Sequence, residues 1–400
     1  MRELLSTDSL FDEQAQRTLA HALFGGADLG ECITTMQRIP AGDTTAWQVQ
    51  WRATADRVAA LGDASAARGH PVSAREAWLR AANYYRTAYL FAYANPVPPI
   101  VRELLAQETA VFGKAAAALA PALVPVEIPY DGVTLPGCFC PGGAGTRPLL
   151  VCTGGYDSTL RESYFAFAVA AQRRGWHALL FDGPGQGRVV IEQGIPMRGD
   201  WEAVVAPVID FALTLPGVDP ERIALTGWSL GGYLSLRAAA FEPRLAACVS
   251  DPGLPGMLAP MAKMFAALPP GTLDDPLHAD PALFAPYAAH IAADPALHWK
   301  VEQRAYMVHG VDSLPAYLAA ARAFDVAPHL ANIRCPMFVA CEENDPLAAF
   351  APAVFDALTC AKTLQRFTAA EGAGDHTAIL ARSLFLARMF DWLDETVAAR

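Results

Sequence analysis

The sequence predicts an α/β fold in which a mostly parallel sheet is flanked by helices on both faces and preceded by a helical domain. Three observations lead to this prediction. The first 123 residues carry apolar side chains at helical spacing and no strand signal. From Val124 onward, short apolar runs alternate with helical stretches, and such runs are typical of parallel strands buried on both faces. A region rich in Pro, Ala and Met, residues 253–333, interrupts this alternation.

Residues 1–123 are expected to form a helical N-terminal cap domain. Asp43 or Thr44 can cap a long helix that contains Trp47 and Trp51. Residues 73–76 read Ser-Ala-Arg-Glu, the pattern of a capping box, which predicts that the next helix begins at about Ser73. A further helix is expected after residues 98–99, which are both proline.

Residues 124–400 are expected to form the catalytic domain. The pair Asp131-Gly132 stands between two alternating apolar runs and predicts a hairpin at the start of the sheet. Residues 253–333 are expected to be a helical insertion over the strand ends. The remaining predicted strands are Leu149–Cys152, Ala178–Phe181, Ile223–Leu225, Ala246–Ser250, Met337–Ala340 and Thr363–Phe367.

The composition excludes several classes of protein. Of 400 residues, 53% are hydrophobic and 18% charged, a balance that disordered chains do not have. The net charge is −11 and no run of Lys or Arg occurs, so nucleic acid is not an expected partner. No apolar stretch is long enough to span a bilayer. The N-terminus lacks the pattern of a signal peptide, so a cytoplasmic location is expected.

No metal or cofactor is expected. The eight cysteines include no C-x-x-C pair and no paired Cys/His spacing of a zinc site. The turn at residues 182–187, Asp-Gly-Pro-Gly-Gln-Gly, resembles a phosphate-binding loop only superficially. It lacks the Gly-Lys-Ser/Thr ending and the G-x-G-x-x-G spacing, so it is interpreted as a tight turn at the end of a strand.

The strongest chemical signal is the G-x-S-x-G motif from Gly227 to Gly231, which stands between a predicted strand and a predicted helix. In this context the motif is a nucleophile elbow, a strained turn that projects a serine hydroxyl from the sheet. Glycines two residues on either side remove Cβ atoms that would collide. Ser229 is therefore the predicted nucleophile. The Leu230 N–H, at the start of the helix, is a predicted oxyanion donor.

A nucleophilic serine needs a base and a carboxylate that orients it. His376 lies in a glycine-flanked loop before the last predicted helix and is the predicted base. Asp345 follows the strand Met337–Ala340 and is the predicted orienting carboxylate. Glu342 and Glu343 are nearby alternatives, and Asp251 is a more distant one.

A second oxyanion donor is expected in the turn Thr-Gly-Gly-Tyr-Asp at residues 153–157, which follows another predicted strand. The backbone N–H of Gly155 or of Tyr156 is the candidate. Trp228 and Asp157, which stand in the two glycine turns, are candidate substrate-binding residues.

The order of sheet, Gly-Trp-Ser-Leu-Gly-Gly elbow, Asp345 and His376 resembles the α/β-hydrolase superfamily. Residues 73–86, residues 153–158 and residues 198–202 are also similar to segments of the pseudooxynicotine hydrolase group. That group includes fungal hydrolases that shorten polyketide pigment precursors. The resemblance implies hydrolysis of a carbon–carbon bond in a 1,3-dicarbonyl or acyl-aromatic small molecule. It also implies an additional acidic residue near the substrate, for which Asp251 is the candidate, and a tendency to form homodimers.

Other functions use the same three residues. An esterase, thioesterase, lactonase or acyl transferase is the alternative, since the motif by itself supports only a serine acyl hydrolase. A peptidase of the prolyl-oligopeptidase type is disfavoured, because those enzymes usually carry a strand-rich propeller before the hydrolase domain. A non-catalytic binding module is disfavoured because all three triad positions are filled.

Overall fold

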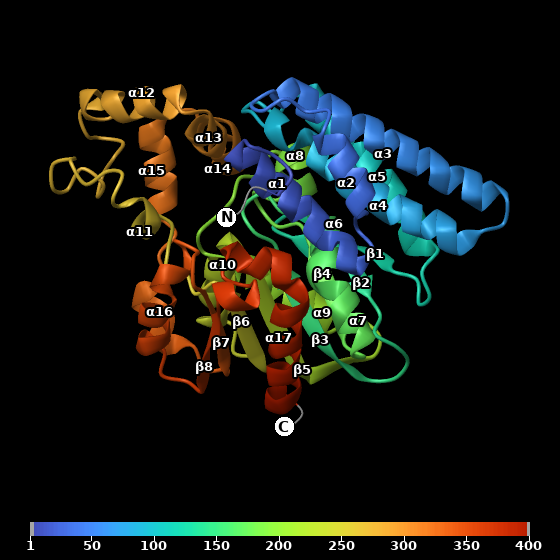
Figure 1. Ribbon diagram of the computed structural model, residues 1–400. Coiled ribbons are helices and arrows are strands. Elements are labelled where there is room, and N and C mark those ends of the chain that lie inside the picture. The colour runs from blue at the N-terminus through green and yellow to red at the C-terminus, as the bar shows by residue number, and fades with distance from the viewer. Residues whose placement is uncertain (1–3, 398–400) are drawn as a thin grey trace.

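The computed structural model describes residues 4–397, which form an eight-stranded sheet flanked by helices and topped by helical segments (Figure 1). The strand order is β1-β2-β4-β3-β5-β6-β7-β8. All neighbouring pairs from β4 to β8 are parallel, whereas β2 pairs antiparallel with β1 and β4. The predicted fold class is therefore confirmed. The strands are β1 (Val124–Tyr130), β2 (Val133–Cys140), β3 (Arg147–Thr153), β4 (His177–Phe181), β5 (Val218–Trp228), β6 (Ala247–Asp251), β7 (Met337–Glu342) and β8 (Lys362–Phe367).

The first two strands form the predicted hairpin. Val133 pairs with Tyr130 across the turn, and both turn residues have positive φ, 41° for Asp131 and 78° for Gly132. Two consecutive residues of positive φ fit the type of two-residue turn that matches the twist of paired strands. This local rule explains why the sequence predicted the hairpin correctly.

In the part of the chain that the structure describes, the secondary structure before β1 consists of helices, the last of which ends at Ala117. Its helices are α1 (Ser9–Ala20), α2 (Leu29–Met36), α3 (Thr44–Ala67), α4 (Pro71–Tyr89) and α5 (Pro99–Ala117). Asp43 caps α3 by accepting a hydrogen bond from the Ala46 N–H. The capping box predicted at Ser73 is wrong. The helix α4 already begins at Pro71, because proline is well suited to the first helical turn, where its missing N–H costs no hydrogen bond.

Helices cover both faces of the sheet, and a second group of helices follows β6. The covering helices are α6 (Leu160–Ser163), α7 (Val169–Arg173), α8 (Gly187–Gln193), α9 (Glu202–Ala212), α10 (Leu230–Ala239), α16 (Ala351–Ala357) and α17 (Arg382–Val397). The helices of the insertion are α11 (Leu258–Met261), α12 (Ala285–Ala293), α13 (Pro295–Leu297), α14 (Tyr306–His309) and α15 (Leu314–Arg322). Within residues 4–397, no helix is long and apolar enough to cross a membrane.

The helix α1 lies between the other N-terminal helices and the segment that follows β8. Figure 1 shows it crossing the middle of the molecule, between the other N-terminal helices and α17. It packs against the segment His376–Ala381, which follows β8, and against α4. Because parallel strands place their carboxyl ends at one edge of the sheet, α1 lies where the predicted site residues gather.

Candidate active site

Ser229 stands at a sharp turn between β5 and α10. Its backbone angles are φ 58° and ψ −124°, a combination that side-chain-bearing residues rarely adopt and that stores strain. A Cβ on Gly227 would collide with the carbonyl oxygen of Gly231, and a Cβ on Gly231 would lie 2.8 Å from the carbonyl oxygen of Gly154. The two glycines of the motif are thus sterically required, as the sequence predicted.

The structure brings Ser229, His376 and Asp345 together. The His376 Nε2 lies 3.0 Å from the Ser229 Oγ, and the His376 Nδ1 lies 2.7 Å from the Asp345 Oδ2. Both distances are within hydrogen-bond range for a nucleophile, base and orienting carboxylate. The three side chains come from the ends of β5, β7 and β8, so the sheet determines their spacing.

The electrostatics suit a base at His376. Burial by itself would lower the pKa of the imidazole, but the hydrogen bond and the charge of Asp345 hold that pKa above its ordinary value. Asp345 is 5% exposed and also accepts a hydrogen bond from the Leu347 N–H. The alternatives do not contact the imidazole. Glu342 is buried, and its burial and the neighbouring Asp251 raise the pKa of its carboxyl group well above the ordinary value. Glu343 accepts a hydrogen bond from the Ala369 N–H.

The turn after β3 lies directly against the nucleophile. A Cβ placed on Gly155 would be 3.1 Å from the Ser229 Cβ. The Gly155 N–H donates to the Ser158 Oγ at 3.0 Å. The turn at residues 182–187 braces this loop, since the Gln186 Nε2 donates to the carbonyl oxygens of Gly154 and Gly155 at 2.8 and 3.0 Å. The glycine-rich turn, which the sequence analysis interpreted as a tight turn at the end of a strand, therefore supports the loop beside Ser229.

Asp251 is not where the resemblance implied. Its side chain is fully buried and does not line the cavity beside Ser229. The Arg382 Nη1 donates to the Asp251 Oδ2 at 2.8 Å, and the Ser229 N–H donates to the Asp251 carbonyl oxygen at 2.6 Å. The structure therefore places Asp251 outside the residues that line the cavity, away from the position that the resemblance implied. The ion pair with Arg382 turns the carboxylate into the protein, where it supports the elbow from behind.

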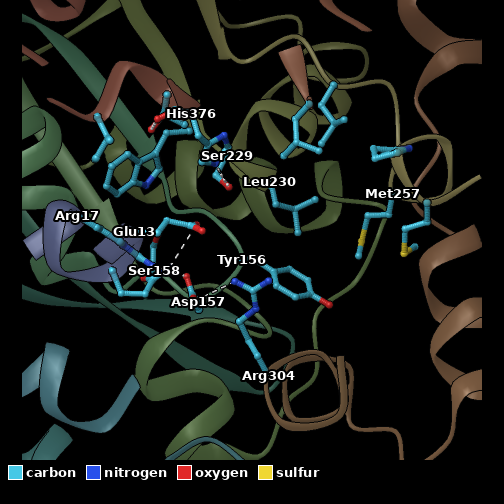
Figure 2. Close-up of a pocket in the computed structure, with 18 of the residues that line it drawn as sticks. Glu13, Arg17, Tyr156, Asp157, Ser158, Ser229, Leu230, Met257, Arg304 and His376 are labelled. Atoms are coloured by element: carbon cyan, nitrogen blue, oxygen red, sulfur yellow. Dashed lines mark hydrogen bonds and ion pairs between the residues drawn. The ribbon is translucent and has the colours of Figure 1, made fainter. Parts of the chain in front are cut away.

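A cavity of about 250 Å³ that opens to solvent lies over Ser229 and His376 (Figure 2). Trp228, Leu230, Tyr156 and Asp157 line it. One side is apolar and comes largely from the insertion. The other side carries charged residues from α1, from the turn after β3 and from the segment before α14. The apolar side includes Leu254, Met257, Pro260, Met261, Leu347 and Ile379.

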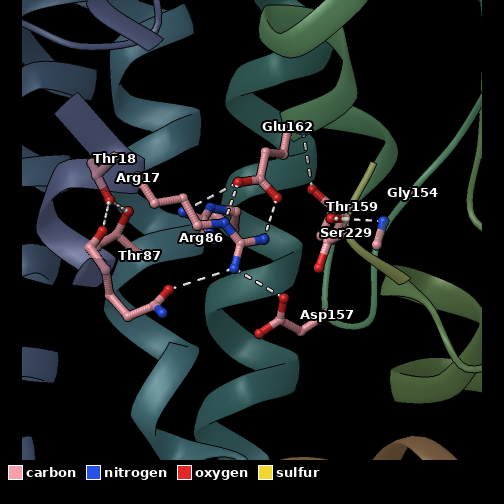
Figure 3. A network of polar contacts seen from close by, with 12 residues as sticks. Arg17, Thr18, Arg86, Thr87, Gly154, Asp157, Thr159, Glu162 and Ser229 are labelled. Carbon is pink, nitrogen blue, oxygen red and sulfur yellow. Dashed lines mark hydrogen bonds and ion pairs between the residues drawn. The ribbon is translucent and has the colours of Figure 1, made fainter. Parts of the chain in front are cut away.

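Sequence reasoning missed the charged side of the cavity. Glu13, Arg17 and Arg304 line it, and they lie on helices that showed only apolar periodicity. Arg17 donates to both carboxylate oxygens of Glu162 at 2.6 and 2.5 Å and to the Asp157 Oδ1 at 2.9 Å (Figure 3). The periodicity of α1 could not mark Arg17, because its partners Asp157 and Glu162 lie 140 and 145 positions away along the chain.

A sheet of this topology, with a serine at a strained turn between a strand and a helix, defines a class of hydrolases. The family model described as "Alpha/beta hydrolase family" matches residues 139–389. The chain belongs to this family and is a hydrolase.

Fungal proteins are among its relatives. It is 39% identical over 63% of its length to 20-hydroxy-prefusarin hydrolase FUS2 of Gibberella moniliformis. It is 32% identical over 98% of its length to hydrolase LUC6 of a Fusarium species, covering 97% of that protein. The alignment with FUS2 spans only 62% of FUS2.

Among solved structures, that of the 2,6-dihydroxy-pseudo-oxynicotine hydrolase superposes with a TM-score of 0.74 and 24% identity, covering 95% of this chain and 96% of that one. At this identity the superposition supports the shared fold, including the N-terminal helices. The predicted resemblance to the pseudooxynicotine hydrolase group and to fungal hydrolases is thus confirmed.

Proposed function

We propose that the protein is a serine hydrolase that acts through an acyl-enzyme on a small molecule. The hydrogen-bonded series Ser229, His376 and Asp345 at 3.0 and 2.7 Å carries this proposal. His376 takes the Ser229 proton as the oxygen attacks a carbonyl carbon, and Asp345 stabilises the imidazolium that forms. Water then hydrolyses the acyl-enzyme, with His376 again acting as the base.

The oxyanion of the tetrahedral intermediate is expected to rest on backbone N–H groups. Leu230, the first residue of α10, supplies one donor. Gly155 or Tyr156 supplies the other. The Gly155 N–H faces the Ser158 hydroxyl, and Ser158 lines the cavity, so an oxyanion at this position would replace that hydroxyl as the acceptor.

The bond we propose to be cleaved is a carbon–carbon bond next to a ketone, in a 1,3-dicarbonyl or acyl-aromatic molecule of polyketide type. Collapse of the tetrahedral intermediate expels the leaving carbon as an enolate, which His376 protonates, and the acyl group stays on Ser229. The similarity to the hydrolases named above supports this choice. Hydrolysis of an ester or thioester by the same residues is the alternative.

A matched pair of substrates tests the proposal. An aryl 1,3-diketone and the aryl ester of the same acyl group are compared by kcat/KM, with the Ser229→Ala variant as the blank. We expect the diketone to be cleaved at least as efficiently as the ester. Turnover of the ester alone would refute the carbon–carbon step and leave an esterase. Turnover that survives in Ser229→Ala would refute the triad.

A further inference from the structure

Three guanidinium groups share two carboxylates beside the cavity. Arg17 pairs with Asp157 and Glu162, Arg86 lies 3.5 Å from the Glu162 Oε1, and the Arg304 Nη1 lies 3.3 Å from the Asp157 Oδ2 (Figures 2 and 3). Both carboxylates are buried. Burial alone would raise their pKa values, but the arginines hold both below the ordinary range. Both are therefore ionised at neutral pH, and one positive charge is left over.

Two neighbouring acidic side chains have cationic partners of their own. Glu108 pairs with Arg161 at 2.7 Å, and Glu13 lies 3.8 Å from the Lys300 Nζ. His21 is the other residue that contacts Glu162. Burial lowers the pKa of its imidazole, which favours the neutral form, so His21 does not change this charge count. Within the network of Arg17, Arg86, Arg304, Asp157 and Glu162, the guanidinium groups thus outnumber the carboxylates by three to two. Burying an uncompensated charge is costly, which favours an anion at this place.

The two arginines that line the cavity differ in how many of their N–H donors form hydrogen bonds. Arg17 makes three hydrogen bonds of 2.9 Å or less to carboxylates. For Arg304, the one hydrogen bond found in residues 4–397 is the 3.3 Å contact with Asp157, and its buried Nε has no partner. The Arg304 guanidinium is held instead by aromatic rings, 5.1 Å from the Tyr156 centroid and 4.6 Å from the Trp299 centroid. Arg304 is positioned and still has donors available.

We propose that Arg304 is a specificity-determining residue that binds an anionic oxygen group of the substrate, a carboxylate or an ionised enol. The rest of the substrate lies along the apolar side of the cavity, against Leu254, Met257 and Met261. The substrate class is therefore an amphiphilic molecule with an acidic end and an apolar chain. This inference rests on the proposed function only for the place of the reacting bond, which lies at Ser229 between the two sides.

Binding to the Ser229→Ala protein tests the inference without turnover. The probes are octanoate, ionised 2-octanoylcyclohexane-1,3-dione and neutral octanamide, measured by calorimetry. We expect at least one anion to bind about tenfold more tightly than octanamide, since a hydrogen bond to a charged group contributes about that factor. The anion that binds more tightly shows whether Arg304 prefers a carboxylate or an ionised enol. In the Ser229→Ala/Arg304→Met protein this preference is lost, and with Arg304→Lys part of it is retained.

Equal binding of anions and octanamide would overturn the inference, as would an equal loss for all probes in Arg304→Met, which indicates a packing role. Arg322→Met is the matched control, because Arg322 is half-exposed on α15 and pairs with Asp274. A thermal melt of each variant checks that the fold is retained.

Kinetics separate the two proposals. Mono(4-nitrophenyl) adipate and its methyl ester differ only in one charge, and we expect Arg304→Met to lower kcat/KM for the half-ester about tenfold and for the methyl ester less than twofold. If Arg304→Met lowers kcat/KM by similar factors for the half-ester and for the methyl ester, the proposed role of Arg304 is contradicted. If neither ester is hydrolysed while the anion preference in binding persists, the Ser229 chemistry fails and the anion site stands.

Discussion

The two halves of the site are built in different ways. The reacting half consists of Ser229, Asp345 and His376, which lie in the segments that follow β5, β7 and β8. The charged half consists of Arg17, Asp157 and Arg304, which come from the N-terminal helix α1, the turn after β3 and the insertion. The first half depends on one sheet, and the second half depends on how three distant segments pack together.

This difference separates side chains whose positions must be fixed accurately from side chains that can change between related proteins. Strand ends in one hydrogen-bonded sheet are fixed relative to one another, which is what a proton transfer over 3.0 Å requires. Helices of a cap can change their side chains without disturbing that sheet. The reacting half can therefore serve one chemistry while the charged half selects the molecule that undergoes it.

The largest effect should come from the reacting half. Ser229→Ala removes the oxygen that attacks the carbonyl, and we expect kcat to fall by about 10⁵-fold or more. Stopped assays of purified protein measure the change. Because alanine keeps the Cβ of the elbow residue, the backbone strain is unchanged and we expect the melting temperature to change little. A fall of less than about 100-fold would show that Ser229 is not the nucleophile.

Asp345→Asn tests the orienting carboxylate. We expect kcat/KM to fall by about 10⁴-fold, because the imidazole loses the partner that fixes its tautomer. The pH profile should also move. His376 acts as a base only when neutral, so activity declines as the pH falls through the pKa of His376, which Asp345 raises. In Asp345→Asn this decline should therefore shift to lower pH. An unchanged profile would assign the orienting role to another group.

The charged half should affect stability more than chemistry. Glu162 is fully buried and contacts Arg17, Arg86 and His21. Glu162→Gln leaves the two arginines without their carboxylate, and we expect the free energy of unfolding in urea to decrease by about 3–5 kcal/mol. The effect has a defined pH dependence. The folded-state pKa of Glu162 is depressed, so its contribution is present at neutral pH and is lost as the pH falls through that pKa.

The matched control for this prediction is Glu103→Gln. Glu103 pairs with Arg52 at 2.5 Å, but the two side chains are 50% and 32% exposed. An exposed pair contributes little, so this variant should unfold at nearly the wild-type urea concentration. If the two variants behave alike, the buried network does not hold the N-terminal helices on the sheet.

The smallest effect concerns the position of α1. The Asp8 carboxylate accepts hydrogen bonds from the Leu10 and Phe11 N–H groups at the start of this helix, each at 3.0 Å. Asp8→Ala should lower the free energy of unfolding by about 1 kcal/mol, the usual contribution of such a cap. We expect KM to rise slightly and kcat to stay within about twofold, because α1 contributes Glu13 and Arg17 to the cavity but no reacting atom. A large loss of kcat would mean that α1 also positions His376, which it packs against.

Much of the molecule follows from patterns within short stretches of sequence. The strand runs, the Asp131-Gly132 hairpin and the Gly227–Gly231 elbow depend on neighbours in the chain, so their geometry could be predicted. The start of α4 at Pro71 was missed because two local signals, a proline and a capping-box pattern, competed two residues apart. The sequence predicted a tight turn at residues 182–187, but the support that this turn gives Gly154 and Gly155 requires a contact between residues 32 and 31 positions apart.

By itself, the sequence determined the class of fold, the elbow serine and the candidates for its two partners, because each depends on local backbone geometry and on the order of strands. Only the tertiary structure decided which carboxylate faces His376, turned Asp251 away from the cavity into an ion pair with Arg382, and placed Arg17, Asp157 and Arg304 side by side. The physical reason is that charge pairing acts through space. The partners of a buried charge are set by packing between segments, and no pattern along one segment records them.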